Sequence, residues 1–504
     1  MGIGTILIRA DATSAMGTGH VMRCLALAQA WQDAGGKAAF AMVQSTEALQ
    51  VRLARESCHI TPIRADLAGA DDMQQTVAIA NDLGCEWIVL DGYQFGSAFQ
   101  AGLKSSGAKV LVPDDYGHAG QYPADVVLNQ SVTASPTLYS SCSPGTRLLL
   151  GPRYSLLRRE FSRWRDWRRT IPSKCRRVLV TMGGSDEHNV TATVLQALSL
   201  MGSDGLETTV LAGGSNRHLI DLHQYVARSG SNVEVRTDVC DVGESMAQSD
   251  VAISAAGSTC WELCLLSLPS LLIDIADNQT PVAKEMDRRR CAVHIGDQAV
   301  RPQAIVEALK SLVADCDLRR ALAENSKSLV DGRGAARVVA VLTGSPVLQL
   351  RALREGDRRL LWEWANDPEV RSASFSSDPI PWDTHTSWFN AKLPEPPKTS
   401  LSHRVFIAED EEGVPVGQIR FEKHADAHWD VGLSLSKDFR GRGLASRLIV
   451  MGIRELIADA GHASMHAYVK PQNVASVKSF ERAGFERIGV EQVNGREALH
   501  LVYS

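Results

Sequence analysis

The sequence lacks the long apolar stretch that a membrane-spanning helix requires, because none of its hydrophobic runs reaches about 18 residues. Its first residues lead at once into a strand-like segment, TILIRA, without the basic and apolar regions of an export signal. Ten cysteines are present, yet no two form a Cys-x-x-Cys pair, and Cys260 and Cys264 lack further thiolates at zinc-ligand spacing. We therefore expect a cytoplasmic protein with reduced thiols, without a membrane span and without a bound metal.

A strong excess of positive charge is also missing. The chain carries 53 basic and 58 acidic residues, a net charge of −5, which argues against a general nucleic-acid-binding protein. Arginines are dense only in residues 153–177, where acidic residues are mixed among them. This segment is either a solvated interdomain helix and linker or a nucleic-acid patch, and its mixed charge favours the linker.

The length of 504 residues exceeds what one hydrophobic core usually supports, and it predicts several domains. In residues 1–155, short apolar runs such as WIVLD alternate with helical patterns, and residues 156–344 repeat this alternation. The alternation predicts an α/β fold of two doubly wound parallel sheets, with a ligand cleft between their carboxyl edges. A third unit, residues 347–504, follows a Thr-Gly-Ser-Pro break and has the mixed element order of an α+β domain.

Glycine turns follow several predicted strands of the first two domains. Three of them precede a helix, where backbone N–H groups and the helix dipole favour an anion such as a diphosphate. Their residues are Gly17, Gly19 and His20 in the first domain, and Gly183, Gly184, Ser185, Gly257, Ser258 and Thr259 in the second. A single glycine after a strand is often an ordinary tight turn, so the inference depends on two such turns occurring in one domain.

Two side chains beside these turns are candidates for chemistry. His20 opens the first helix at the ligand end of the sheet, where its imidazole is either a general base or a structural histidine. Glu262 lies four residues after Ser258, where it either accepts hydrogen bonds from both hydroxyls of a ribose or is an exposed helix carboxylate. A base, a diphosphate site and a nucleoside clamp are together what cleavage or transfer of a nucleoside-diphosphate sugar requires.

Longer stretches, among them RADATSAMGTGHVMRCLALA, VLDGYQFG, VTMGGSD and SAAGSTCWELC, resemble the UDP-sugar hydrolases of pseudaminic acid biosynthesis over nearly all of residues 1–342. The resemblance implies the GT-B fold that these enzymes share with the lipid-linked glucosaminyl transferase of peptidoglycan synthesis. It also implies inverting hydrolysis of UDP-2,4-diacetamido-2,4,6-trideoxy-β-L-altropyranose, in which His20 activates or positions the attacking water.

The same resemblance implies further contacts to the sugar nucleotide. They fall on Tyr93, Asn278, Gln279 and Ser254, and on the residues from 257 to 262 named above. Asp11 is either another ligand or the cap of a turn. A glycosyltransferase of similar fold with a separate acceptor is the alternative, although the first domain shows no amphipathic or apolar patch for a lipid acceptor.

The third unit contains a second anion-binding pattern. HWDVGLSLSKDFRGRGLASRLI predicts a strand, a basic glycine turn and an amphipathic helix, and the turn is a nest that fits a pyrophosphate. With the downstream Asn-x-x-Ser and Ala-Gly-Phe, the pattern resembles the GCN5-related N-acetyltransferases and implies acetyl-CoA as cosubstrate. The expected contacts to coenzyme A are Leu433, Leu435, Arg440, Gly441, Arg442, Gly443, Leu444, Ala445, Asn473 and Ser476.

Acetyl transfer in that family proceeds by direct attack of a neutral amine on the thioester. Asp430 is the expected general base, with Glu422 as the alternative, and either is equally compatible with a plain solvent-facing strand position. Phe480 stands where many members carry a tyrosine acid. Tyr468 or Ser479 is expected to replace it, or the thiolate leaves unaided. A non-catalytic acyl-CoA-sensing domain is the alternative explanation of the missing tyrosine.

The two resemblances imply consecutive reactions, since the hydrolase substrate carries an acetamido group at C4. We therefore expect a bifunctional enzyme of pseudaminic acid biosynthesis, with flagellin glycosylation as its setting. It N-acetylates UDP-4-amino-4,6-dideoxy-N-acetyl-β-L-altrosamine and then hydrolyses the product. Its expected partners are this UDP-linked amino sugar, acetyl-CoA and other enzymes of the pathway, with no nucleic acid and no membrane.

Overall fold

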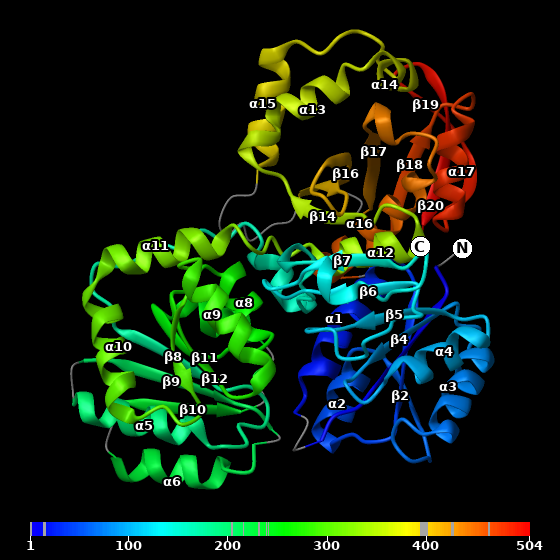
Figure 1. The fold of residues 1–504 in the computed structure, drawn as a ribbon. Helices are drawn as coiled ribbons and strands as arrows, with labels where there is room; N and C mark the ends of the chain where they lie inside the picture. Colours follow the sequence, from blue (N-terminus) through cyan, green and yellow to red (C-terminus); the bar gives the residue numbers. More distant parts are fainter. Residues whose placement is uncertain are drawn as a thin grey trace. The chain divides into compact units, whose positions relative to one another are not determined.

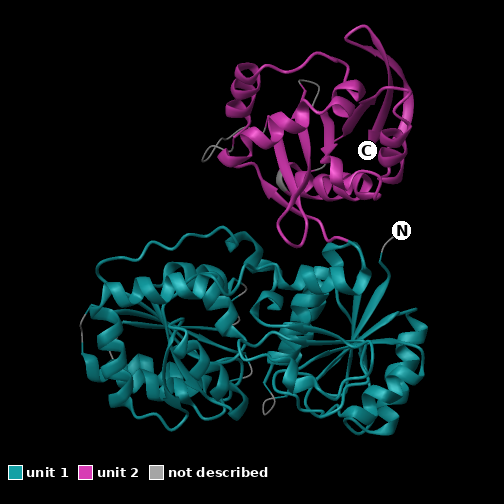
Figure 2. Ribbon diagram, turned by 45° about the horizontal axis from the view of Figure 1, so that its top comes forward, with its two compact units in different colours: residues 1–345 teal, residues 346–504 magenta. Residues whose placement is uncertain are grey.

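In the computed structural model, the chain forms two compact units, residues 1–345 and 346–504, which we describe separately (Figure 1, Figure 2). The structure describes residues 3–13, 17–202, 205–214, 216–229, 232–237, 239, 241–393, 402–424, 428–461 and 464–503. Within this part of the chain, no helix combines the length and apolar character needed to cross a membrane.

The first lobe of unit 1 is a seven-stranded parallel sheet in the order β3-β2-β1-β4-β5-β6-β7. Its central strands are continuous buried runs, as expected for a parallel sheet covered by helices on both faces (Figure 1). The strands are β1 (Thr5–Ala10), β2 (Lys37–Met42), β3 (His59–Pro62), β4 (Trp87–Asp91), β5 (Lys109–Pro113), β6 (Val126–Asn129) and β7 (Arg147–Leu150). The helices are α1 (Gly19–Asp33), α2 (Glu47–Arg55), α3 (Ala70–Asp82), α4 (Ser97–Ser105) and the short η1 (Pro136–Tyr139), η2 (Pro152–Tyr154) and η3 (Arg159–Trp164).

The second lobe of unit 1 is a six-stranded parallel sheet in the order β10-β9-β8-β11-β12-β13. Successive residues of its strands point to opposite faces, so Val178 and Val180 join one core cluster while Leu179 joins the other. The strands are β8 (Arg177–Thr181), β9 (Glu207–Ala212), β10 (Val233–Thr237), β11 (Val251–Ala255), β12 (Ser270–Asp274) and β13 (Val293–Asp297). The helices are α5 (Val190–Met201), α6 (Leu219–Ser229), α7 (Val242–Gln248), α8 (Thr259–Leu265), η4 (Asp277–Gln279), α9 (Thr280–Arg288), α10 (Pro302–Ala314), α11 (Cys316–Lys327) and α12 (Gly334–Thr343).

The last helix of unit 1 returns to the first lobe. α12 packs against α1, and the carbonyl of Leu342 accepts a hydrogen bond from Trp87 Nε1 at 3.1 Å. At the start of α12, a Cβ on Gly334 would lie 2.3 Å from the carbonyl oxygen of Ser155, so the close approach requires glycine. The sequence pattern had grouped residues 334–344 with the second domain, whereas their packing partners belong to the first lobe.

The arginine-rich segment 153–177 binds to both lobes of unit 1. Arg159 forms an ion pair with Asp33 of α1 at 2.8 Å, and Arg169 Nε donates to the carbonyl of Leu266 at 2.9 Å. These arginines are thus engaged inside the unit, which supports the interdomain linker rather than the nucleic-acid patch.

Unit 2 contains a seven-stranded mixed sheet in the order β14-β15-β16-β17-β18-β20-β19, and among its described strands only β17 and β18 pair in parallel. Its strands are β14 (Gln349–Ala352), β15 (His403–Glu409), β16 (Pro415–Lys423), β17 (Trp429–Leu435), β18 (Met465–Val469), β19 (Glu486–Val493) and β20 (Arg496–Tyr503). Its helices are η5 (Glu355–Asp357), α13 (Arg358–Ala365), α14 (Pro368–Ala373), α15 (Trp382–Lys392), η6 (Lys437–Phe439), α16 (Leu444–Ala460) and α17 (Val474–Arg482). The two sheet types confirm the expected fold class, a GT-B pair of Rossmann-like lobes followed by an α+β domain.

Candidate functional site

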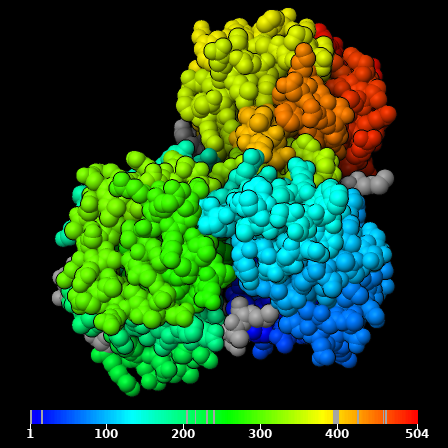
Figure 3. All heavy atoms as spheres, in the orientation of Figure 1, coloured from blue at the N-terminus to red at the C-terminus, as the bar shows by residue number. Residues whose placement is uncertain are grey.

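A cleft of about 1200 Å³ lies between the carboxyl edges of the two parallel sheets of unit 1. It is larger than the roughly 300–1,000 Å³ of most small-molecule sites, and a nucleotide sugar fits in such a volume. Strand order reverses between β1 and β4 and between β8 and β11, and the segments after these strands line the cleft. In Figure 3 the two lobes, green and blue to cyan, are separate masses with a groove between them.

Most residues that the sequence suggested for the sugar nucleotide line this cleft. They are Gly17, Gly19, His20, Tyr93, Gly183, Gly184, Ser185, Gly257, Ser258, Thr259, Glu262, Asn278 and Gln279. Two others do not line it. Asp11 is buried and accepts hydrogen bonds from the backbone N–H groups of Val43 and Gln44, and Ser254 is fully buried within β11 and donates to a neighbouring carbonyl.

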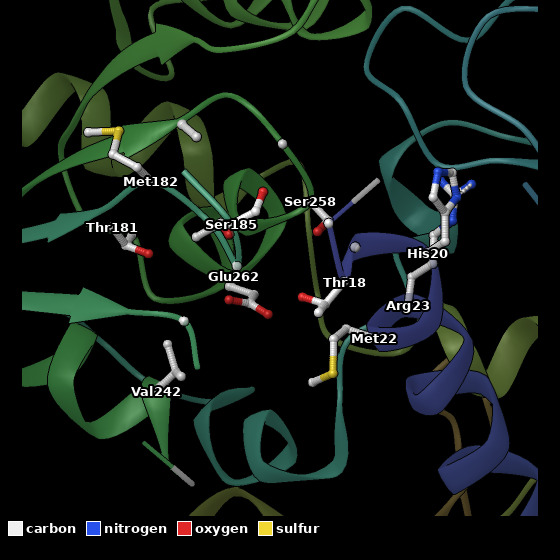
Figure 4. Close-up of a pocket in the computed structure, with 18 of the residues that line it drawn as sticks. Thr18, His20, Met22, Arg23, Thr181, Met182, Ser185, Val242, Ser258 and Glu262 are labelled. Carbon is white, nitrogen blue, oxygen red and sulfur yellow. Dashed lines mark hydrogen bonds between the residues drawn. The ribbon is translucent and has the colours of Figure 1, made fainter. Parts of the chain in front are cut away.

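His20 is held by a buried carboxylate. It is the second residue of α1, and its Nδ1 lies 2.7 Å from Oδ1 of Asp91, the last residue of β4. An ionised carboxylate only accepts hydrogen bonds, so Nδ1 carries the proton and donates it, which leaves Nε2 of the neutral ring as an acceptor. Figure 4 shows His20 and Arg23 on α1 at one side of the cleft, with Ser185, Ser258 and Glu262 at the other. An imidazole held by Nδ1 in this way can present Nε2 to a ligand as a proton acceptor.

The charge of Asp91 is balanced by Arg23, one helical turn after His20. The guanidinium donates to both carboxylate oxygens of Asp91 at 2.7 Å and to both of Asp115 at 2.8 Å. Tyr93 OH donates to Asp115 at 2.6 Å and accepts from Nδ2 of Asn278 at 2.9 Å. Asn278 belongs to the second lobe, so one hydrogen-bonded network connects the histidine to the opposite wall of the cleft.

Titration properties follow from this network. Burial alone would raise the pKa of Asp91, but Arg23 and His20 oppose it and hold the pKa well below its usual range. Burial, reinforced by Asp115, raises the pKa of Tyr93 far above its usual value, so its hydroxyl stays protonated. At neutral pH the site therefore contains an ionised Asp91 and a neutral phenol.

The glycine turns approach each other closely across the cleft. A Cβ on Gly184 would lie 2.4 Å from Oγ1 of Thr18, and Gly17 and Gly183 have positive φ angles of 73° and 79°. These conformations favour glycine. The turn that precedes α1 and the turn that follows β8 thus lie in contact with each other. Backbone N–H groups at such turns are suited to phosphate oxygens.

Glu262 is a buried member of an ion pair rather than an exposed helix carboxylate. It is 8% exposed, and its Oε1 lies 3.0 Å from Nη2 of Arg158. Burial raises the pKa of Glu262, and Arg158 partly offsets the rise. Because it also lines the cleft, the carboxylate is placed to accept hydrogen bonds from hydroxyl groups of a ligand.

Sequence reasoning missed Asp91, Arg23 and Asp115. Two signals in the chain point to them. Arg23 follows His20 at i+3, which puts both on one face of α1. Asp91 ends the apolar run WIVLD, and Asp115 follows the neighbouring strand β5, so both carboxylates lie at the same sheet edge as His20.

The second candidate site lies in unit 2, where β17 and β18 separate. β17 pairs with β16 from Trp429 to Leu435, but it pairs with β18 only at Trp429 and Asp430. Among the residues that the structure describes, the β18 side of residues 431–435 therefore has no strand ladder. An extended ligand can hydrogen-bond to this open edge as a further strand does.

The glycine turn after β17 has the backbone of an anion nest. Gly441 and Gly443 have φ angles of 74° and 70°, and α16 begins at Leu444, which is buried in the core. Arg440 is not directed to solvent alone, since it forms ion pairs with Asp367 at 3.0 Å and Glu369 at 2.8 Å. The remaining residues predicted for coenzyme A are Leu433 and Leu435 on the open part of β17, Arg442 and Ala445 at the turn, and Asn473 and Ser476, which form the N-terminal cap of α17.

Asp430 and Glu422 face each other across β16 and β17. Asp430 accepts a hydrogen bond from Nε2 of His424 at 2.8 Å, whereas Glu422 forms an ion pair with Lys392 at 3.2 Å. Tyr468 lies two residues after His466, the partner of Asp430, and so shares its sheet face.

The other two positions considered for the acid differ from Tyr468. Phe480 is 2% exposed and packs against Phe485 at 4.9 Å between ring centroids. Ser479 Oγ donates to the carbonyl of Ala475 in its own helix. Of the three positions, Tyr468 is the one on the face that carries Asp430.

Comparison with protein families gives two partial matches. The sequence model of the glycosyltransferase family 28 C-terminal domain matches residues 177–336, and that of the acetyltransferase (GNAT) domain matches residues 348–486. The second lobe of unit 1 and most of unit 2 are thus similar to these domains. The matches support an enzyme with acyltransferase and sugar-nucleotide chemistry.

Three curated proteins are similar to all or part of this chain. An uncharacterised protein of Methanocaldococcus jannaschii is 21% identical over 510 residues, 96% of either chain. The UDP-2,4-diacetamido-2,4,6-trideoxy-beta-L-altropyranose hydrolase of Campylobacter jejuni is 23% identical and covers 55% of this chain and 94% of its own. The UDP-N-acetylglucosamine--N-acetylmuramyl-(pentapeptide) pyrophosphoryl-undecaprenol N-acetylglucosamine transferase of Acetivibrio thermocellus is 24% identical, over 34% of this chain and 48% of its own.

Proposed function

We propose that the protein is a bifunctional enzyme that N-acetylates UDP-4-amino-4,6-dideoxy-N-acetyl-β-L-altrosamine and hydrolyses the resulting UDP-diacetamido sugar. The observation that carries the hydrolase half is the His20 and Asp91 pair, which holds the imidazole by Nδ1 at a cleft rimmed by glycine turns. The acetyltransferase half is supported by the open edge of β17 and the glycine nest that follows it.

In the proposed hydrolysis, water attacks the anomeric carbon from the face opposite the diphosphate. Nε2 of His20 accepts a proton as the new C–O bond forms, and Asp91 stabilises the imidazolium. The bond between the anomeric carbon and the phosphate oxygen breaks with its electron pair going to UDP. Backbone N–H groups at Gly183–Ser185 and Gly257–Thr259 stabilise the charge of the leaving UDP, so a separate general acid is not required.

Hydrolysis is favoured over glycosyl transfer by the extent of the similarities. The Campylobacter hydrolase is matched over nearly its whole length, whereas the Acetivibrio transferase is matched over about half of its own. A transferase also needs an acceptor site beside the sugar. The network from His20 to Asn278 lines this side of the cleft with polar groups, which suit a water molecule and a sugar.

In the proposed acetyl transfer, the pantetheine arm pairs with the open edge of β17 and the pyrophosphate occupies the nest at Gly441–Ala445. The sugar amine attacks the thioester carbonyl, a C–N bond forms, and the C–S bond breaks to release the thiolate of coenzyme A. Asp430 accepts the proton of the amine, and Tyr468 supplies one to the thiolate. The archaeal relative matches 96% of this chain, so its similarity spans both units.

The proposal is tested with the purified full chain and the UDP-4-amino sugar, with and without acetyl-CoA, followed by phosphorus NMR and mass spectrometry. Release of UDP and a free diacetamido sugar only in the presence of acetyl-CoA is expected. Because the anomeric configuration of the first product reports inversion, a proton NMR time course is recorded in parallel.

Other results would change the assignment. Tight binding of coenzyme A without turnover of any amino sugar would identify unit 2 as an acyl-CoA sensor. Absence of UDP release until a second sugar or a lipid acceptor is added would identify unit 1 as a glycosyltransferase.

A further inference from the structure

A cluster of imidazoles lies on the sheet face of unit 2 that is opposite α16. Trp429 and Met465 point into the core beneath α16, so the alternate residues Asp430 and His466 point to the other face. Four histidines gather there, with neighbouring ring centroids between 4.2 and 4.9 Å apart. They are His424, His428, His466 and His500. Apart from Asp430, the acetyl transfer proposed above uses none of this cluster.

Two of these histidines, His424 and His428, lie between the end of β16 and the start of β17. The backbone N–H of His424 donates to the carbonyl of His428 at 2.9 Å, which closes a hairpin and puts both side chains on one face. Their rings are parallel, with an interplanar angle of 4° and centroids 4.8 Å apart. His466 stacks on the far side of His428 at 4.2 Å, so the middle ring is held between two others.

The imidazoles of His424 and His428 both direct Nε2 to the carboxylate of Asp430. Nε2 of His424 lies 2.8 Å from Oδ2 of Asp430, and Nε2 of His428 lies 3.6 Å from Oδ1. The second distance is too long for a hydrogen bond, and Oδ1 is a buried oxygen without a hydrogen-bond partner. One ligand atom from each of the three residues lies within 4.8 Å of the other two.

These separations match those of donors around one metal ion. Nitrogen and carboxylate ligands lie about 2.0–2.2 Å from zinc, which places the ligand atoms of a tetrahedral site about 3.4 Å from each other. The separations of 2.8 Å to Oδ2 and 3.6 Å to Oδ1 lie on either side of that value, and all three groups offer ligand atoms within 4.8 Å of one another. An ion between the three groups would also give the buried Oδ1 of Asp430 the partner that it lacks.

We propose that His424, His428 and Asp430 bind one divalent transition-metal ion of the zinc class. Two imidazole nitrogens and one carboxylate oxygen suit such ions better than calcium or magnesium, which prefer oxygen ligands throughout. Three protein ligands leave a fourth position for water or a substrate group. The proposed acetyl transfer uses Asp430 as a base in the metal-free chain, and a bound ion would compete with the proton for its carboxylate oxygens.

Binding is measured directly on the metal-free full chain without a histidine tag, by titration with Co²⁺ and observation of its visible absorption. We expect one Co²⁺ per chain, with bands that disappear when one equivalent of Zn²⁺ is added. His424→Gln changes a half-exposed side chain and should weaken binding about tenfold or more, and the double variant His424→Ala/His428→Ala should abolish the bands. His223→Ala, an exposed histidine of α6, is the matched control and should bind as the parent does.

Two results would overturn the proposal: no Co²⁺ bands in the parent chain, or equal affinity and stoichiometry in His424→Gln and the parent. Circular dichroism of each variant shows whether it is folded. If the double variant does not fold, the affinity of the single variant His424→Gln decides the test. Since no sugar or acetyl-CoA is present, the result does not depend on the function proposed for unit 2.

Discussion

The two candidate sites differ in the parts of the chain that form them, side chains in unit 1 and backbone in unit 2. In unit 1 the central groups are side chains: His20, its partner Asp91 and the arginine that balances both, all within hydrogen-bonding distance. In unit 2 the candidate coenzyme site is mainly backbone: an open strand edge and a turn with two left-handed glycines. The first site is therefore sensitive to the identity of side chains, and the second to backbone conformation.

The difference corresponds to what each proposed ligand demands. An inverting hydrolysis needs one base held at a fixed angle to a water molecule, and a buried charged network supplies that rigidity. Coenzyme A presents a peptide-like arm and a diphosphate, both of which backbone groups recognise without side chains. Substitutions that separate side-chain from backbone effects are the way to test this comparison.

The largest effect is expected from His20→Ala. Removal of a general base should lower kcat for UDP release by about 10³-fold, because such groups contribute roughly 10²–10⁴-fold. Acetylation of the amino sugar should continue at the parental rate, which mass spectrometry of the UDP-linked product measures. Loss of both activities in a folded variant would show that the two sites are not separate.

Asp91→Asn should have the next largest effect. Asparagine keeps the shape but removes the charge that stabilises the imidazolium, so kcat should fall about 100-fold with KM little changed. The pKa of Asp91 is lower in the folded chain than the unfolded value of about 3.9, so its charge stabilises the fold above that pH and less as the pH falls. Thermal unfolding of the variant should accordingly depend less on pH on the acid side.

Asp11→Asn is the control for Asp91→Asn. Asp11 is equally buried in the same lobe but does not line the cleft, so its variant should be less stable with kcat within about twofold of the parent. A large loss of kcat in Asp11→Asn would instead support a direct role for Asp11 in binding the substrate.

At the backbone site, Gly443→Val should weaken binding of coenzyme A about tenfold. The φ of Gly443 is 70°, a conformation that costs a β-branched residue roughly 1–2 kcal/mol. Gly443→Asn is the matched variant, since asparagine tolerates this region, and it should retain most of the affinity. Isothermal titration calorimetry distinguishes the two, and equal losses would show that side-chain volume, not backbone strain, governs the turn.

The smallest effect is expected from Tyr468→Phe. A thiol has a free pKa of about 8.5 and is a fair leaving group, so removal of its proton donor should lower kcat for acetylation only about 3- to 10-fold. Ser479→Ala, whose hydroxyl bonds to its own helix, should leave the rate unchanged. If the serine variant is the slower one, the assignment of the acid is wrong.

Patterns with a fixed period predicted the fold well. Alternating apolar runs and helices indicated two parallel sheets, and the glycine turns were expected at their carboxyl edges, where the structure has them. The site partners were harder to predict, because Asp91 and Arg23 are 68 residues apart and meet only through the strand order. Glu262 was expected either to bind the ligand or to be exposed. Only the fold shows that it forms an ion pair with Arg158.

The return of α12 to the first lobe has a mechanical consequence. The chain passes between the lobes twice, and the two passages touch where Arg165 Nε donates to the carbonyl of Gly332 at 3.1 Å. Two adjacent connecting segments form a double hinge. They permit the two lobes to rotate about the axis through both segments, and they resist rotation of the lobes about other axes. Opening of the cleft for a nucleotide sugar would then carry Asn278 away from Tyr93 along a fixed arc and bring it back to the same place.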